Sequence, residues 1–173
     1  MNKEAFYKIS YGLYIVSSCK ESKNNGFICN TVFQTTSEPQ TIAICSNKQN
    51  LTTDYIISSK LFSVSIIQQE VDLKYVGLFG FKSGKDTDKF KDITYVTGKS
   101  GVPVVTDKIL SYFECEVINT VDLGTHLLFV AKILDAEVLK EGEPLTYHYY
   151  RNVIKGFSPK TAPTYISKDT PKT

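Results

Sequence analysis

The sequence predicts a single, mainly β domain, an antiparallel β-barrel with a few helices attached. Three observations indicate this class. The chain has 173 residues, an ordinary length for one domain. Many short β-rich stretches follow one another at close spacing, and only a few helical patterns lie between them. This series lacks the regular strand–helix alternation that a parallel sheet requires.

The N-terminal third contains three strand candidates. Residues 11–19 are rich in β-forming residues and are followed by a cluster of turn-forming residues at 21–26. Residues 27–35 and 41–47 are the next two candidates, separated by the turn sequence at 37–39. Short strands joined by short turns favour antiparallel pairing of neighbours.

The second half contains three more strand candidates. Residues 62–68 alternate apolar residues with serine, the two-residue period of a half-buried strand. Residues 109–119 alternate in the same way and place Cys115 and Glu114 on opposite faces. Residues 126–139 are long enough to form a bent strand that crosses a barrel.

Helical patterns are fewer and shorter. Asn50 is placed to cap a helix through Ser59, with Asp54 in the first turn, where a carboxylate interacts favourably with the helix dipole. Residues 70–79 and 4–9 are two further candidates. Residues 158–173 combine three prolines with Lys, Ser and Thr, so we expect an extended C-terminal tail after a domain of residues 1–157.

Composition argues against several classes of partner. The chain has 20 basic and 18 acidic residues, a formal charge of +2, which is not the basic excess that nucleic-acid binding calls for. No apolar run approaches the roughly 20 residues needed to cross a bilayer. The first residues lack the order of a signal peptide, so we expect a cytoplasmic protein with no membrane partner.

Reactive side chains are scarce. The four cysteines include no CxxC pair, so we expect reduced, buried thiols rather than metal ligands. Two histidines make a multi-histidine metal site implausible. The glycine-rich motifs for dinucleotides and phosphates and the GxSxG elbow of hydrolases are missing. The chain is therefore a binding protein or an enzyme that uses the chemistry of a cofactor.

Two segments are candidates for anion binding. Residues 46–52 form a loop of hydroxyl and amide donors around Lys48 and lead into the predicted helix, whose free N–H groups favour a phosphate. The alternative is an ordinary capped helix with a solvated Lys48. Residues 79–90 contain two glycines that allow close backbone approach and three lysines, although an exposed charged loop explains them equally well.

Two further segments could contact a planar ligand. His126 ends a turn at the start of a predicted strand, where it could contact a nucleotide or a flavin edge, or form a hydrogen bond within a corner of the fold. Residues 147–151 are an aromatic cluster that could stack on a planar ligand. The same cluster would serve equally well as a core or dimer contact.

Read in order, these segments resemble the flavin reductase-like, FMN-binding split-barrel family, in particular its group with flavoredoxin and the flavin domain of high-molecular-weight rubredoxin. The resemblance extends from Met1 to about Tyr165. It is carried by seven segments, at residues 7–16, 25–34, 37–40, 47–52, 79–90, 143–147 and 158–165. Their shared order is more specific than any single motif.

The resemblance implies a homodimer of six-stranded Greek-key barrels with one FMN per subunit near the interface. The isoalloxazine ring would be lined by Asn30, Thr31, Val32, Phe33 and Gln34. The phosphate end would be held by Ser46, Asn47, Lys48, Asn50 and Thr52. A loop would close over it with Phe81, Lys82, Ser83, Gly84 and Lys89. Tyr149 or Tyr150 would come from the partner subunit, and His126 would lie near the flavin and nicotinamide face as the catalytic residue.

The implied activity is electron transfer from NADH or NADPH through FMN to a rubredoxin-like or flavin acceptor. A pure FMN electron carrier is the alternative, because the family's Gly-Asp-His reads Gly124-Thr125-His126 here, and Ala131 and Lys132 replace a glycine and an acid that often follow. A barrel that has lost flavin is a third hypothesis. A rubredoxin-like partner would be a separate protein, since no CxxC iron-binding segment follows residue 157 in this sequence.

Overall fold

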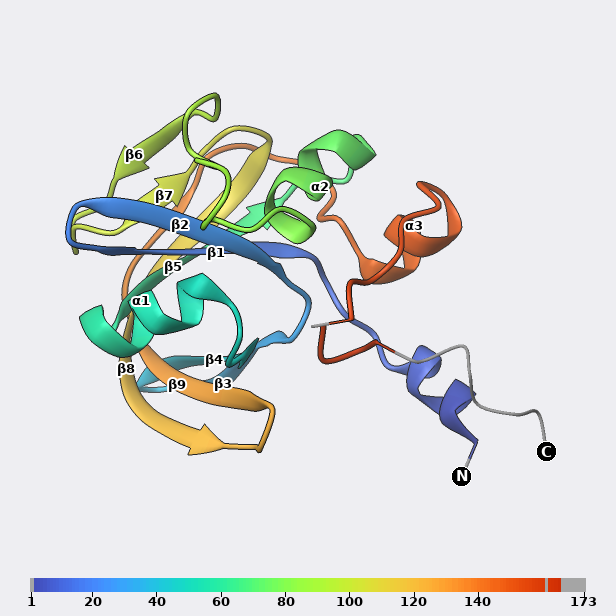
Figure 1. The fold of residues 1–173 in the computed structure, drawn as a ribbon, viewed down its shortest axis with the longest axis horizontal. Coiled ribbons are helices and arrows are strands. Elements are labelled where there is room, and N and C mark those ends of the chain that lie inside the picture. The colour runs from blue at the N-terminus through green and yellow to red at the C-terminus, as the bar shows by residue number, and fades with distance from the viewer. Residues whose placement is uncertain (1, 161, 166–173) are drawn as a thin grey trace.

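The structure is a computed structural model that describes residues 2–160 and 162–165 (Figure 1). A short 3₁₀ helix, η1 (Lys3–Lys8), precedes the barrel. The strands are β1 (Tyr14–Lys20), β2 (Lys23–Cys29), β3 (Val32–Ser37), β4 (Gln40–Asn47), β5 (Leu61–Ile67), β6 (Tyr95–Thr97), β7 (Pro103–Val105), β8 (Ile109–Asp122) and β9 (His126–Val138). The α-helices are α1 (Leu51–Ser59), α2 (Leu73–Gly80) and α3 (Tyr147–Asn152).

The predicted mainly β, antiparallel architecture is confirmed. The main sheet has the order β2-β1-β5-β8-β9-β4-β3, and β6 and β7 form a separate hairpin. The sheet has seven strands rather than the expected six. Bulges at Glu114/Cys115 and Val117/Asn119 shift the β8–β9 register, and bulges of this kind bend a strand and let a sheet curl. Figure 1 shows the long β8–β9 pair extending beyond the body of the sheet.

The extra strand arises where one predicted strand is in fact two. Residues 27–35 break at Asn30 and Thr31, so β2 ends at Cys29 and β3 begins at Val32. The two parts lie at opposite edges of the sheet. The predicted turn at 21–26 is also shorter than expected: Glu21 and Ser22 have positive φ, and pairing with β1 resumes at Lys23.

The helix predictions are largely confirmed. Helix α1 begins after Asn50, as expected, although the Asn50 side chain makes no capping hydrogen bond. Helix α2 begins at Leu73 because Asp72 Oδ1 accepts a hydrogen bond from the Tyr75 backbone at 2.7 Å, an N-cap that moves the start past Glu70. Helix α3 and the β6–β7 hairpin were not anticipated.

Two apolar clusters lie on opposite faces of β1. Val16 belongs to the barrel interior, together with residues of β2, β4, α1, β5, β8 and β9. Ile15 belongs to a second cluster, where α2, β7 and α3 cover the outside of the sheet. Strand β1 is therefore buried on both faces and contributes to both apolar clusters. No helix in the described part of the chain has the length and apolar character to span a membrane.

Strand β5 is likewise buried on both faces, so the expected half-buried strand is wrong. The serines of its outer face lie under the β6–β7 hairpin rather than in solvent. Ser63 Oγ donates to the Pro103 carbonyl at 2.6 Å, and Ser65 Oγ donates to the Val105 carbonyl at 2.9 Å. These serine hydroxyls therefore hold the hairpin against the sheet. A two-residue sequence period cannot show whether such serines are covered in this way or exposed to solvent.

The hairpin is also held by a buried carboxylate on β8. Glu114 is only 1% exposed and accepts hydrogen bonds from the backbone N–H groups of Lys99 (2.9 Å) and Ser100 (2.7 Å). The Ser100 hydroxyl contacts it as well. A Cβ at Gly98 would lie 2.4 Å from this carboxylate, so only glycine fits there. The side chain predicted to lie on the face opposite Cys115 is thus the anchor of the hairpin loop.

Candidate functional site

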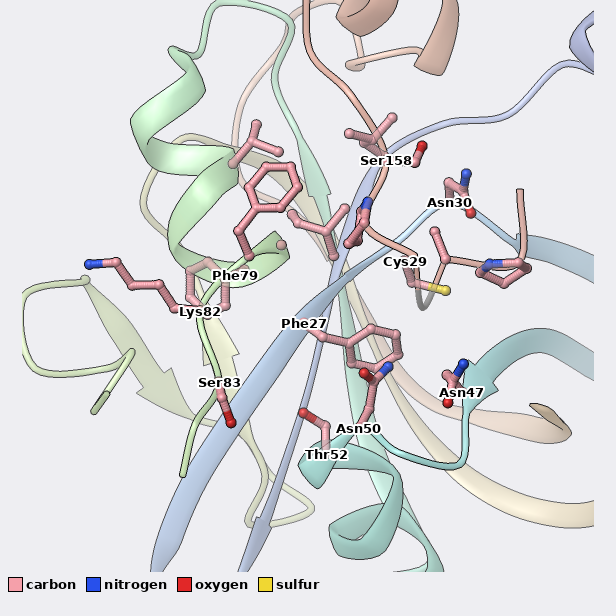
Figure 2. Close-up of a pocket in the computed structure, with 18 of the residues that line it drawn as sticks. Phe27, Cys29, Asn30, Asn47, Asn50, Thr52, Phe79, Lys82, Ser83 and Ser158 are labelled. Carbon is pink, nitrogen blue, oxygen red and sulfur yellow. The ribbon is translucent and has the colours of Figure 1, made fainter. Parts of the chain in front are cut away.

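A cavity of about 320 Å³ opens between β2, the start of α1, the end of α2 and the segment after α3 (Figure 2). Its lining combines one polar end with one apolar end. Ten of the predicted site residues meet there: Asn30, Asn47, Asn50, Thr52, Phe81, Lys82, Ser83, Gly84 and Lys89, with Tyr150 as the alternative to Tyr149. The cavity thus brings together predicted site residues that are up to 120 positions apart in the sequence, from Asn30 to Tyr150.

The polar end lies at the N-terminus of α1. Thr52 and Asn25 are both buried, and Asn25 Nδ2 donates to Thr52 Oγ1 at 3.1 Å. The Asn50 side chain does not cap the helix and lines the cavity (Figure 2). The first N–H groups of a helix carry partial positive charge, so this end of the cavity suits an anion.

Lys89 supplies a buried cation beside that end. It is 4% exposed, and its Nζ donates to the backbone carbonyls of Gly26 (2.8 Å) and Phe79 (3.3 Å). Burial lowers the pKa of this lysine to about 8. Its contacts in the described residues include no carboxylate. An ammonium has three N–H donors, so one is left to meet an anionic ligand.

Glycine is required where the loop after α2 crosses this end. A Cβ at Gly84 would lie 2.2 Å from Asn25 Oδ1, so any side chain would displace the amide that contacts Thr52. Lys82 also borders the cavity, and Figure 2 shows its side chain extending away from the other labelled residues. Lys89 is therefore the lysine of the lining that the fold buries.

The other end of the cavity is largely apolar. Phe27, Phe79 and Cys29 form part of its walls (Figure 2), and Cys45 is also a lining residue. Cys29 is fully buried, and burial raises the pKa of its thiol to about 11, so it remains protonated at neutral pH. The four cysteines are free thiols, as predicted, but only Cys29 and Cys115 are buried, so the expected burial is wrong for Cys19 and Cys45. An apolar slot with a few polar groups is typical of a site for a flat ring.

The segment after α3 covers the apolar end. Ser158, Pro159, Ala162 and Pro163 line the cavity, and Asn30 Nδ2 donates to Thr164 Oγ1 at 2.7 Å. Residues 158–160 and 162–165 were expected to form a tail outside the domain, and they lie here against the site. The rest of that tail, residues 161 and 166–173, lies outside the described residues.

Several predicted site residues lie away from the cavity. Lys48 Nζ forms an ion pair with Asp122 at 2.7 Å. Ser46 is buried and its Oγ lies 2.6 Å from Thr53 Oγ1, a contact that holds α1 against β4. The five others outside the lining are Thr31, Val32, Phe33, Gln34 and Tyr149.

His126 lies one residue away from the lining. In the β4–β9 ladder it pairs with Asn47, which does line the cavity. Its Nδ1 is 2.8 Å from Thr125 Oγ1, and its Nε2 is 3.5 Å from Asn47 Nδ2. The Thr125 hydroxyl therefore orients the ring, and Asn47 stands between the imidazole and the cavity.

Sequence reasoning missed the residues that only the fold brings to the site. Phe27, Cys29 and Cys45 look like ordinary strand residues, and their proximity depends on the pairing of distant strands. Asn25 was assigned to a turn. One feature of the sequence did point to Asn25: residues 25–34 carried part of the family resemblance, although they assigned no role to Asn25 itself.

Comparisons with known proteins identify the relatives of this chain. The family model described as "Flavin reductase like domain" matches residues 6–156. The chain is 47% identical over 166 residues to a ferric-chelate reductase (NAD(P)H) of Archaeoglobus fulgidus, covering 96% of this chain and 98% of that protein. It is 45% identical over 174 residues to a high molecular weight rubredoxin of Moorella thermoacetica, covering 100% of this chain and 76% of that protein.

A solved structure supports the fold independently. Flavoredoxin from Methanosarcina acetivorans superposes with a TM-score of 0.70 at 22% identity, covering 78% of this chain and 74% of that one. Fold, cavity and sequence together define a flavin-dependent oxidoreductase domain. The chain belongs to the flavin reductase-like family.

Proposed function

We propose that this protein binds FMN in the cavity, is reduced by NADH or NADPH, and passes the electrons to a rubredoxin-like protein or to a free flavin. The observation that carries the proposal is the pairing of the buried Lys89 and the α1 N-terminus at one end with an apolar slot at the other. This distribution matches a ligand with an anionic phosphate at one end and a flat ring at the other.

Different residues would hold the phosphate and the ring of FMN. Lys89, Thr52 and the first N–H groups of α1 would hold the phosphate, with Gly84 allowing the loop to approach it. Cys29, Asn30 and Cys45 would border the ring. When bound, FMN would supply the redox chemistry: it can take up a hydride and release the two electrons one at a time to one-electron acceptors such as rubredoxin, or as a pair to a free flavin. The chain would position the ring and exclude water, and hydride transfer needs no separate acid or base from the protein.

His126 and Asn47 would serve the nicotinamide side of the site. The Thr125 hydroxyl fixes the imidazole at the edge of β9, and Asn47 carries a polar group from there into the cavity. The Archaeoglobus relative is named as NAD(P)H-dependent, which supports the nicotinamide as the reductant. The Moorella relative is named a rubredoxin, which supports a rubredoxin-like acceptor.

An anaerobic absorption spectrum tests the activity. The FMN-loaded protein is expected to lose its visible flavin bands within seconds after NADH or NADPH is added. Bands that persist with both nucleotides but disappear with dithionite would favour the alternative, a pure electron carrier, which the replacement of the family's Gly-Asp-His by Gly124-Thr125-His126 motivates. A chain that takes up no flavin would overturn the proposal.

FMN affinity is expected to fall as the pH rises above about 8. The Lys89 ammonium has its pKa lowered to about 8 by burial, and a phosphate favours the charged form. Above that pH the free protein must take up a proton to bind, so the dissociation constant should rise up to about tenfold per pH unit. Fluorescence titrations between pH 7 and 9.5 measure this slope, and Lys89→Met should remove it. An equal slope in the variant would exclude Lys89 as its cause.

We infer that the protein is a cytoplasmic homodimer. Large apolar side chains are exposed on β3 and on the β8–β9 hairpin, among them Phe33, Ile118 and Leu123. An apolar surface of this kind marks a protein interface, and free thiols suit a reducing compartment. Tyr149 would then contact the neighbouring subunit. Sedimentation equilibrium should give twice the chain mass of 19.4 kDa, and a monomer at micromolar concentration would contradict the proposal.

A further inference from the structure

The segment that follows α3 is attached on both sides of the cavity. We define residues 157–160 and 162–165 as the strap. We propose that the strap retains FMN in the cavity, and that release of Thr164 from Asn30 sets the rate at which FMN exchanges. This inference rests on the proposed function. It specifies whether the flavin behaves as a retained group or as an exchanging substrate.

The first attachment of the strap is rigid. Tyr150 is buried, and its hydroxyl donates to the Phe157 carbonyl at 3.1 Å. The Tyr147 hydroxyl contacts Ser158 Oγ. Gly156 allows the chain to pass directly over the Tyr150 ring, because a Cβ there would lie 2.1 Å from the ring. Two aromatic residues of α3 thus fix the point at which the strap leaves the helix.

The second attachment is a single side-chain hydrogen bond. Asn30 is buried where β2 ends, and its Nδ2 donates to Thr164 Oγ1 at 2.7 Å. Between the two attachments, Pro159, Ala162 and Pro163 line the cavity. The Ala162 N–H donates to the Pro159 carbonyl at 3.0 Å.

An aromatic pair on the surface supports the strap from outside. Phe157 stacks on Phe81 with ring centroids 4.6 Å apart, and 66% of Phe157 is exposed. Phe81 belongs to the loop after α2, on the opposite side of the cavity from Asn30. A ligand in the cavity is therefore enclosed by β2, the α2 loop and the strap. Because one side-chain hydrogen bond holds Thr164, whereas two tyrosine hydroxyls hold the α3 end of the strap, the Asn30–Thr164 bond is the attachment that opens first.

The experiment compares Thr164→Val with Thr164→Ser in the full-length protein. Valine keeps the shape of the side chain and removes the hydroxyl, whereas serine keeps the hydroxyl. FMN dissociation is followed as the rise of free-flavin fluorescence after rapid dilution of the FMN-loaded protein. Loss of one hydrogen bond is expected to accelerate dissociation about three- to tenfold in Thr164→Val. If the hydroxyl at position 164 holds the strap closed, the FMN dissociation rate of the serine variant should remain within about twofold of the wild-type rate.

Phe157→Ser provides a second, independent variant. It removes the stack on Phe81 without altering the Asn30 bond, and it should also accelerate dissociation. If Thr164→Val and Phe157→Ser both bind FMN and release it at the wild-type rate, the proposed role of the strap is wrong. It is also wrong if valine and serine at position 164 accelerate FMN dissociation equally. A wild-type protein that binds no FMN would instead overturn the proposed function.

A protease measurement on the wild type tests the same inference without a variant. Lys160 is exposed within the strap. FMN is expected to slow tryptic cleavage after Lys160 severalfold, because the occupied cavity holds the strap closed. Cleavage after Lys20, the exposed last residue of β1, is the internal control and should not change. Equal cleavage after Lys160 with and without bound FMN would contradict the strap.

Discussion

Replacing Lys89 with methionine is expected to weaken FMN binding by about 10- to 100-fold at pH 7. The substitution keeps the length of the aliphatic stem and removes a single charged hydrogen bond to the phosphate, an interaction typically worth about 1.5–3 kcal/mol. Fluorescence titration of FMN measures the loss. The thermal unfolding midpoint of the flavin-free variant serves as a control, since burial already disfavours the Lys89 charge in the free protein.

Lys48→Met is the matched comparison. Sequence reasoning assigned the phosphate to Lys48, but in the structure its ammonium pairs with Asp122 at the surface and does not line the cavity. We therefore expect FMN affinity to change by less than about twofold, as for loss of an exposed ion pair. If Lys48→Met lost much of its FMN affinity and Lys89→Met kept it, Lys48 and not Lys89 would be the lysine that holds the phosphate.

Replacing Glu114 with alanine is expected to destabilise the protein by about 2–4 kcal/mol. The substitution removes a buried acceptor and leaves the N–H groups of Lys99 and Ser100 without their partner, so the β6–β7 hairpin loses its anchor on β8. In a domain of this size that corresponds to a fall of about 10 °C in the unfolding midpoint. Thermal unfolding followed by circular dichroism measures it.

Glu116→Ala is the control for the second prediction. Glu116 lies on the same strand and pairs with Lys132 at 2.7 Å, but both side chains are more than 40% exposed. An exposed ion pair contributes about 0–1 kcal/mol, so the midpoint should barely move. Similar effects of the two substitutions would show that Glu114 is not a special anchor. FMN binding by folded Glu114→Ala is expected to stay normal, because the hairpin lies outside the cavity lining.

The fold class followed from local patterns, because strand periodicity and helix caps are local properties. Asn50 and the start of α1 illustrate this agreement. The errors occurred where distant segments decide. Ser63 and Ser65 alternate as exposed residues would, yet the hairpin covers them. The break at Asn30 is also invisible locally, because its buried amide is satisfied by Thr164, 134 residues later.

The candidate site was predictable in part. Asn50, Thr52 and Gly84 line the cavity, because helix starts and glycine loops are fixed by their own sequence, and their contact with FMN stays a prediction. The choice between Lys48 and Lys89 depended on tertiary structure. Both lysines follow polar segments, and only the packing of β2 against the α2 loop decides which ammonium is buried. The role of the strap likewise required knowing where the chain returns after α3.

The position of the flavin phosphate in a crystal structure of the FMN-loaded protein tests the central claim most directly. We predict that the phosphate lies within hydrogen-bond distance of Lys89 Nζ and Thr52, with the ring between Cys29, Asn30 and the strap. A flavin bound outside this cavity, or a phosphate held by Lys48 instead, would contradict the account.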